Sequence, residues 1–149
     1  MIDSKSIIHE SATIADNVKI GAYAVIDKNV SIGEGTVIKE HAVIRENTTI
    51  GKNNFIFQFA TIGEEPQDLK FHNEHTTCTI GDDNIIREYS SIHRGTKDGI
   101  SNTKIGDNST RTITNMTDID IDSSDNSIAD FAVAAASVCV TNSSGQVKC

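Results

Sequence analysis

Isoleucine occupies every sixth position over the first part of the chain, ten times in succession from Ile8 to Ile62. After a gap of eighteen residues, itself a multiple of six, the same phase resumes at Ile80, Ile86 and Ile92. A period of six matches neither the 3.6 of a helix nor the 2 of a simple strand. Short hexapeptide repeats are typical of a parallel β-helix. The pattern therefore predicts an all-β fold in which one side chain per hexad points to the axis.

The other hexad positions agree with this interpretation. The residue four after each isoleucine is mostly small or β-branched, as at Ala24, Val30 and Thr36, which suits a crowded inner face. The residue three after it is often Asn, Asp or Gly, types that tolerate a positive φ and serve as corners. These predicted corners are Asn17, Asn29, Gly35, Asn47, Asn53, Asp83 and Gly95. Three faces per coil predict a triangular prism with coils stacked ~4.8 Å apart.

Composition limits the classes of partner. A chain of 149 residues is expected to form one domain, and its net charge of −8 argues against binding to nucleic acid or anionic membranes. Because no apolar run is long enough to span a bilayer and the N-terminus lacks signal-peptide features, we expect a cytoplasmic protein without a membrane span. Cys139 and Cys149 could close a small loop, but free thiols are expected in a reducing compartment.

The hexad pattern is interrupted in three places. Residues 64–79 keep the phase on both sides, so they either fill one coil irregularly or loop out of it, and loops on a rigid scaffold often carry sites. Residues 97–103 form a small insertion that shifts the count by one. After residue 108 the pattern fails. We therefore divide the chain into a hexapeptide-repeat β-helix, 1–108, and an atypical polar tail, 109–149, which continues the coil, caps it or is partly disordered.

Histidines are the first candidates for chemistry. His93 follows a ladder isoleucine and is expected to face outward beside Arg94, either as ordinary solvated surface or as part of a site. The spacing of His72 and His75 suits a metal, but no third ligand is in reach. We expect neither a metal nor another cofactor.

Several segments together resemble a known family. They are Met1–Asp3, Ile32–Thr36, Phe57–Glu64, Gln67–Lys70, Ile86–Glu88 and Ile92–Thr96. Over residues 1–108 the chain resembles the N-terminal coils of the cytosolic acyl-[acyl-carrier-protein]–UDP-N-acetylglucosamine O-acyltransferases, which begin lipid A synthesis in Gram-negative bacteria. The resemblance implies a left-handed coil, an exception to the usual right-handed crossover. It also implies a homotrimer with active sites between neighbouring prisms.

The resemblance further implies the substrates and the residues that bind them. The substrates would be UDP-N-acetylglucosamine and an acyl carrier protein that carries a 3-hydroxyacyl chain. The family's aspartate and lysine correspond to Asp68 and Lys70, with Gln67 beside them, and the histidine that lines the cleft corresponds to His93. A lysine suits a phosphate or the acyl donor, and an aspartate accepts hydrogen bonds from sugar hydroxyls.

The family's general base is expected beyond the matched segments. It comes from two histidines three residues apart, whose positions fall here near Asn115 and Asp118, and no histidine follows His93. Asparagine cannot act as a base, and an exposed aspartate, with a pKa of about 4, is a poor one. Loss of a general base typically costs ~10²–10⁴ in rate. The catalytic residue is therefore left unassigned, and we expect weak or absent turnover.

Two other interpretations remain open. The chain could be another hexapeptide acyltransferase, such as the N-acyltransferase that acts later in the same pathway. Alternatively, it could be a non-catalytic β-helix that binds a sugar nucleotide or only assembles, an interpretation that the missing histidines favour.

Overall fold

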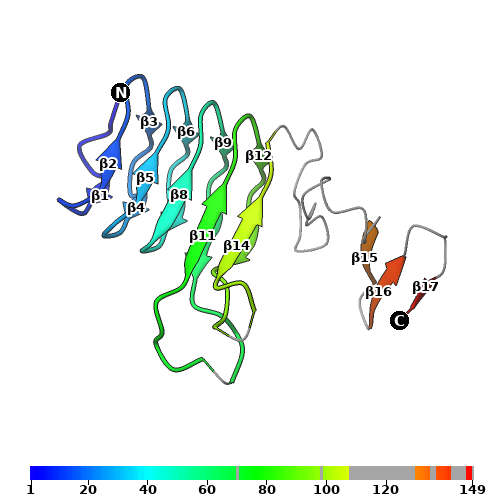
Figure 1. Cartoon of the computed structure of the whole chain (residues 1–149). Coiled ribbons are helices and arrows are strands. Elements are labelled where there is room, and N and C mark those ends of the chain that lie inside the picture. The colour runs from blue at the N-terminus through cyan, green and yellow to red at the C-terminus, as the bar shows by residue number, and fades with distance from the viewer. Residues whose placement is uncertain (70, 98, 108–129, 135–136, 142–146, 149) are drawn as a thin grey trace.

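The computed structural model describes residues 1–69, 71–97, 99–107, 130–134, 137–141 and 147–148. Within these residues the first 107 form a stack of coils, each made of three short strands joined by tight turns (Figure 1). No helix occurs in the described part of the chain, so no helix there could cross a membrane. The prediction of an all-β chain wound in coils is confirmed.

Three parallel sheets form the faces of the prism. The first contains β1 (Ile7–Ile8), β4 (Val25–Ile26), β7 (Val43–Ile44), β10 (Thr61–Glu64) and β13 (Ser91–His93). The second contains β2 (Thr13–Ile14), β5 (Ser31–Ile32), β8 (Thr48–Ile50), β11 (Thr77–Ile80) and β14 (Asn102–Ile105). The third contains β3 (Lys19–Ile20), β6 (Val37–Ile38), β9 (Phe55–Ile56) and β12 (Ile85–Ile86).

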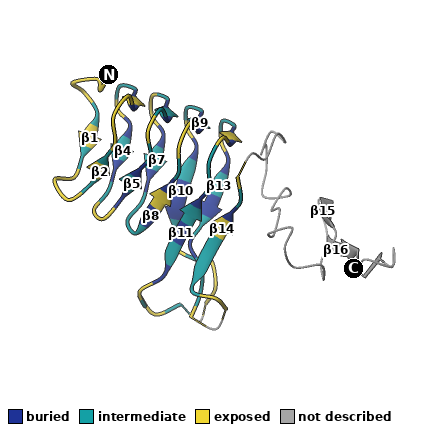
Figure 2. Ribbon diagram, turned by 45° about the horizontal axis from the view of Figure 1, so that its top comes forward, coloured by how far each residue is buried: buried dark blue, intermediate teal, exposed yellow. Residues whose placement is uncertain are grey.

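The ladder isoleucines stack directly above one another. Ile8 pairs with Ile26, and Ile26 pairs with Ile44, so one coil takes eighteen residues and three hexads. From the second coil onward these side chains are buried, with Ile44, Ile56 and Ile62 at 0% exposure. Figure 2 shows this burial on the strands, with the exposed residues mostly in the turns and loops.

Two inner positions depart from the expected small residues. Asn54 and Asn84 lie four residues after a ladder isoleucine and are almost fully buried. The Asn54 side chain donates to the carbonyl of Gly81 at 2.8 Å, while its Oδ1 accepts from the Asn84 backbone N–H at 2.9 Å. Asn84 in turn donates to the Gly106 carbonyl at 3.0 Å. Each amide thus satisfies backbone groups of the next coil, which is how a polar side chain is accommodated in the core.

The predicted corners are confirmed at six of their seven positions, which have φ values between 54° and 72°. Gly95 is the exception: it does not have a positive φ. At the edge that follows the third sheet, the corresponding residues are aromatic instead. Tyr23, His41, Phe59 and Tyr89 all have φ near 60° and stack ring on ring, with centroids 5.2–5.4 Å apart. Stacking between coils offsets part of the cost of left-handed backbone at non-glycine residues.

The first two interruptions of the hexad pattern loop out from the prism. Ile62 pairs with Ile92 and Ile80 pairs with Ile50, so Ile80 lies on the face next after Ile62. Eighteen residues rather than six separate them, and twelve therefore leave the coil. Ile105 pairs with Ile80, so seven extra residues follow Ile92, which is one hexad plus one residue and agrees with the predicted shift of the count by one. The two loops leave the same edge of the prism, where Figure 1 shows them protruding together.

The proposed tail, 109–149, lies largely outside the described residues. Its described strands are β15 (Asp130–Ala134), β16 (Ser137–Thr141) and β17 (Val147–Lys148), which pair antiparallel. The division of the chain at residue 108 and the three alternatives for the tail stay predictions.

Asn54→Ala is expected to destabilise the β-helix by about 1–3 kcal/mol, because the Gly81 carbonyl and the buried Asn84 N–H each lose their partner. Urea unfolding followed by circular dichroism measures the change. Thr49→Ala, on the exposed side of β8, is the matched control and should change stability by less than about 0.5 kcal/mol. Equal midpoints for the two variants would show that the buried amides contribute nothing.

Candidate functional site

A β-bulge at Gly63, within strand β10, lies beside the candidate site. The pairing of β10 with β13 shifts by one residue after Ile62, so Glu64 rather than Gly63 lies opposite His93. Gly63 has a φ of 80°, and a Cβ on it would run into the Thr48 hydroxyl. Only glycine fits this position, and the extra residue redirects Glu64 and Glu65 along the edge of the prism.

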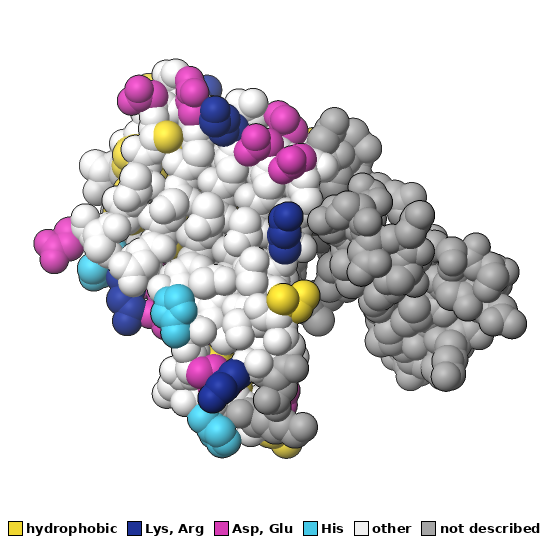
Figure 3. All heavy atoms as spheres, viewed as in Figure 1, with side chains coloured by type: hydrophobic (Ala, Val, Ile, Leu, Met, Phe, Trp, Pro, Cys, Tyr) yellow, Lys and Arg dark blue, Asp and Glu magenta, His cyan; other side chains and the backbone are white. Residues whose placement is uncertain are grey.

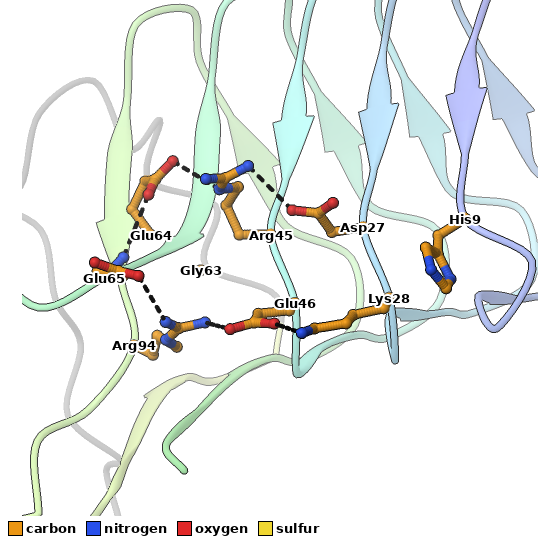
Figure 4. A pocket seen from close by; sticks show the side chains of 9 residues that line it. All are labelled: His9, Asp27, Lys28, Arg45, Glu46, Gly63, Glu64, Glu65 and Arg94. Carbon is orange, nitrogen blue, oxygen red and sulfur yellow. Dashed lines mark hydrogen bonds and ion pairs between the residues drawn. The ribbon is translucent and has the colours of Figure 1, made fainter. Parts of the chain in front are cut away.

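A pocket of about 320 Å³ lies at this edge. Apart from Gly63, its lining side chains are charged groups and one histidine, contributed by successive coils (Figure 4). The lining residues are His9, Asp27, Lys28, Arg45, Glu46, Gly63, Glu64, Glu65 and Arg94.

Two chains of ion pairs cross the coils in this pocket. In the first, Arg45 lies between Asp27 at 3.1 Å and Glu64 at 2.9 Å. In the second, Glu46 lies between Lys28 at 2.8 Å and Arg94 at 3.1 Å. In the first chain the sign of the charge alternates from coil to coil. In the second, Glu46 and Glu65 of successive coils are both acidic, and Arg94 of the next coil pairs with both.

Arg94 connects this network to the loop of residues 65–76. Its side chain is only 5% exposed, and its second guanidinium nitrogen lies 3.8 Å from the Glu65 carboxylate. The guanidinium also lies 5.9 Å from the centre of the Phe71 ring, on the same loop. The Arg94 backbone N–H donates to the Glu64 carbonyl at 2.9 Å. The loop therefore begins at a point fixed by a buried cation.

The neighbouring cations change the protonation of Glu46. The hydrogen bond from Lys28 lowers the pKa of the Glu46 carboxyl, burial opposes that shift, and the charges of Lys28 and Arg94 lower the pKa further. Glu46 is thus held as a carboxylate between two cations.

His93 ties strand β13 to the same loop. Its Nδ1 lies 2.6 Å from the Glu65 carbonyl oxygen, and its Nε2 lies 3.0 Å from the Ser91 hydroxyl. Because a carbonyl oxygen can only accept, Nδ1 carries the proton, and in the neutral ring Nε2 is left as the acceptor. The imidazole faces outward, as the sequence predicted, and is partly buried by the loop.

Two more of the predicted site residues, Gln67 and Asp68, lie on the loop itself. Gln67 and Asp68 are exposed, and the Asp68 carbonyl accepts from the Phe71 N–H at 2.9 Å in a turn. Lys70 lies outside the described residues. His93 contacts the loop at Glu65, two residues before Gln67, and so the structure places three of the four residues on or against one segment. Figure 3 shows His, Lys/Arg and Asp/Glu side chains together on the protruding loops.

His72 and His75 are both exposed on this loop. Across the described ranges, no three His, Cys, Asp or Glu side chains lie close enough together to hold a metal ion.

The sequence analysis missed the ion-pair network. Its signal was present as opposite charges eighteen residues apart, Asp27 with Arg45 and Lys28 with Glu46. That spacing becomes meaningful only once the coil length is known.

The comparisons with known proteins define the class first. Residues 11–46 match the family model described as bacterial transferase hexapeptide (six repeats). With the three parallel sheets and the solved relatives below, this match makes the fold a left-handed parallel β-helix.

The relatives then identify the segment. The chain is 52% identical over 107 residues to an acyl-[acyl-carrier-protein]–UDP-N-acetylglucosamine O-acyltransferase from Trichlorobacter lovleyi, covering 72% of this chain and 41% of that protein. The corresponding protein of Stutzerimonas stutzeri is 48% identical and is covered to 42%. The crystal structure of UDP-N-acetylglucosamine O-acyltransferase from Moraxella catarrhalis superposes with a TM-score of 0.70 at 51% identity, covering 71% of this chain and 41% of that one.

The predicted resemblance is therefore confirmed: the matched residues are a segment of this O-acyltransferase. The chain spans about 41% of the length of these curated relatives.

Arg94→Met is expected to destabilise the β-helix by about 1–3 kcal/mol, because Glu46 and the Glu65 carboxylate lose a buried donor. Limited proteolysis should also cleave the loop of residues 65–76 faster. Lys39→Met is the matched control, since its pair with Glu40 is long, at 4.0 Å, and exposed, and such pairs are worth under about 1 kcal/mol. Loop cleavage at the wild-type rate in Arg94→Met would contradict the anchoring role.

Stability is expected to fall in acid. A carboxyl whose folded pKa is lowered stabilises the fold above its unfolded value of 4.5 and loses that contribution as the pH drops through the folded pKa. The hydrogen bond from Arg87 lowers the pKa of Glu88 to about 2, which extends the pH range of this loss of stability to lower pH. Urea midpoints should decline between these values, and less steeply in Glu46→Gln than in the exposed control Glu40→Gln. Parallel pH profiles would refute the role of Glu46.

Proposed function

We propose that the chain carries the substrate-recognition half of an O-acyltransferase. The reaction moves a 3-hydroxyacyl group from an acyl-carrier-protein thioester to the 3-hydroxyl of UDP-N-acetylglucosamine, the first step of lipid A synthesis. The observation that carries the proposal is the contact of His93, in the matching segment Ile92–Thr96, with Glu65, which lies between the matching segments Phe57–Glu64 and Gln67–Lys70. The identity of 52% over 107 residues supports it.

In this proposal the loop of residues 65–76 binds the substrate. Asp68 and Gln67 are exposed on it, so a ligand can reach both side chains from solvent. Asp68 accepts hydrogen bonds from sugar hydroxyls, Lys70 pairs with a phosphate or the acyl donor, and His93 lines the cleft. The protein works in the cytoplasm as a homotrimer, and a neighbouring prism supplies the other wall of the cleft.

Turnover is proposed to be weak. The sugar hydroxyl is a weak nucleophile and needs a general base, usually histidine. The positions where the family places its base, near Asn115 and Asp118, hold no histidine and lie outside the described residues.

A second candidate function is non-catalytic binding of the sugar nucleotide. The absence of any histidine after His93 favours it. The two functions share the binding residues and differ in whether acyl transfer occurs.

We expect the purified chain to bind UDP-N-acetylglucosamine and to form acylated product at least about 10²-fold more slowly than a full-length relative, because the general base is missing. Calorimetry measures binding, and mass spectrometry measures product made from a 3-hydroxyacyl carrier-protein thioester. Asp68→Asn and His93→Ala should weaken binding about tenfold, whereas Asp83→Asn, at an exposed corner, should leave it unchanged.

Two outcomes would count against this account. Turnover at the rate of a full-length relative would contradict the missing base, and absence of binding would contradict both candidate functions. Sedimentation tests the trimer directly, since a stable monomer has no cleft between prisms.

A further inference from the structure

A serine and a histidine stand side by side on the outer face of β13. Ser91 and His93 flank the buried Ile92, and strand alternation puts both side chains on the same, partly exposed surface. The Ser91 hydroxyl lies 3.0 Å from His93 Nε2. Neither motif comparison nor the proposed function assigns a role to Ser91.

A third group fixes the histidine in the orientation that a base requires. The Glu65 carbonyl, 28 residues away in the sequence, accepts from Nδ1–H at 2.6 Å. In the neutral ring, the free lone pair is therefore on Nε2, directed at the Ser91 hydroxyl. A nucleophile, a base and a group that orients the base are the recurring elements of covalent acyl transfer.

A second serine–histidine pair in the same molecule lacks this arrangement. The Ser11 backbone N–H donates to His9 Nδ1 at 3.1 Å, so the proton-bearing nitrogen of neutral His9 is Nε2. The Ser11 hydroxyl lies 2.9 Å from the same Nδ1 and accepts from the Asn29 N–H at 3.0 Å. That pair closes a local turn, and its hydroxyl holds the neighbouring coil in place.

We propose that Ser91 is an acyl-accepting nucleophile activated by His93, with an acyl thioester as its substrate. Ser91 Oγ bonds to the thioester carbonyl carbon as its proton passes to His93 Nε2. The carbon–sulfur bond then breaks, and the departing thiolate takes that proton to leave as a thiol. The product is an acyl ester on Ser91, which water or a second hydroxyl removes by the reverse proton path.

This activity rests on the proposed function only for the class of acyl donor. It needs neither the sugar nucleotide nor a cleft between prisms, because all three groups belong to one chain. It also supplies a base at a position where the chain does contain a histidine.

The test uses the full chain and an octanoyl N-acetylcysteamine thioester. Release of the thiol is followed in solution, and peptide mapping by mass spectrometry locates the acyl group. Neutral hydroxylamine treatment removes acyl groups from cysteine and leaves a serine ester in place. We expect the adduct on Ser91, with Ser11 unlabelled in the same map as an internal control.

Ser91→Ala should abolish the adduct, and His93→Gln, whose side-chain amide can still donate to the Glu65 carbonyl, should slow its formation by at least about 10²-fold. Circular dichroism checks that both variants fold, and Ser91→Ala removes only one oxygen from the surface. No adduct on Ser91, equal labelling of Ser11, or an unchanged rate in His93→Gln would each overturn the proposal. An adduct without acylated sugar would support it and leave the proposed function unsupported, whereas acylated sugar formed equally by Ser91→Ala would do the reverse.

Discussion

The stacking of isoleucine on isoleucine between successive coils is the interaction on which the rest of this structure depends. The ladder isoleucines pair with their equivalents on the same face of the neighbouring coils, eighteen residues away where no loop intervenes, as Ile26 does with Ile8 and Ile44. Burial of such a side chain contributes about 1.5–3 kcal/mol. Since the same residue recurs on all three faces, the cross-section of the prism is constant. Extra residues cannot be packed inside it, so both insertions leave at an edge.

That constancy explains why the fold could be predicted from the sequence and why parts of the core could not. A period of six identifies the inner residue of each face without any knowledge of the partners. The roles of Asn54 and Asn84 depend on backbone groups of the next coil, Gly81 and Gly106, which the loop insertions move away from the regular spacing in sequence. Judged from the repeat pattern alone, an amide at an inner position is a buried polar group that would destabilise the fold. Only the structure shows that the neighbouring carbonyl accepts its hydrogen bond and makes the contact stabilising.

The same limit applies to the site. Strand alternation was enough to place the side chain of His93 on the outside. Its orientation depends on a carbonyl oxygen 28 residues away, delivered by a bulge at Gly63 that hexad counting does not reveal. Arg94 and Glu46 are 48 residues apart for the same reason, because the twelve inserted residues lie between them. Sequence therefore marked the candidate motifs, and the coil geometry determined which of their atoms meet.

The ion pairs also supply information that the isoleucine ladder lacks. Every inner ladder position holds isoleucine, so a coil that paired with the wrong neighbouring coil would still bury its isoleucines. The isoleucine pattern alone therefore specifies the register between coils weakly. The charged residues at the edge of the prism favour one register between the coils over the others. A slip of one coil would bring Asp27 beside Glu64 in place of Arg45, and two like charges about 4 Å apart repel by roughly 1–4 kcal/mol, depending on solvent exposure. The alternation of charge thus favours the single stacking order in which Glu64 and Glu65 meet Arg45 and Arg94, and it is this order that places His93 against the start of the loop.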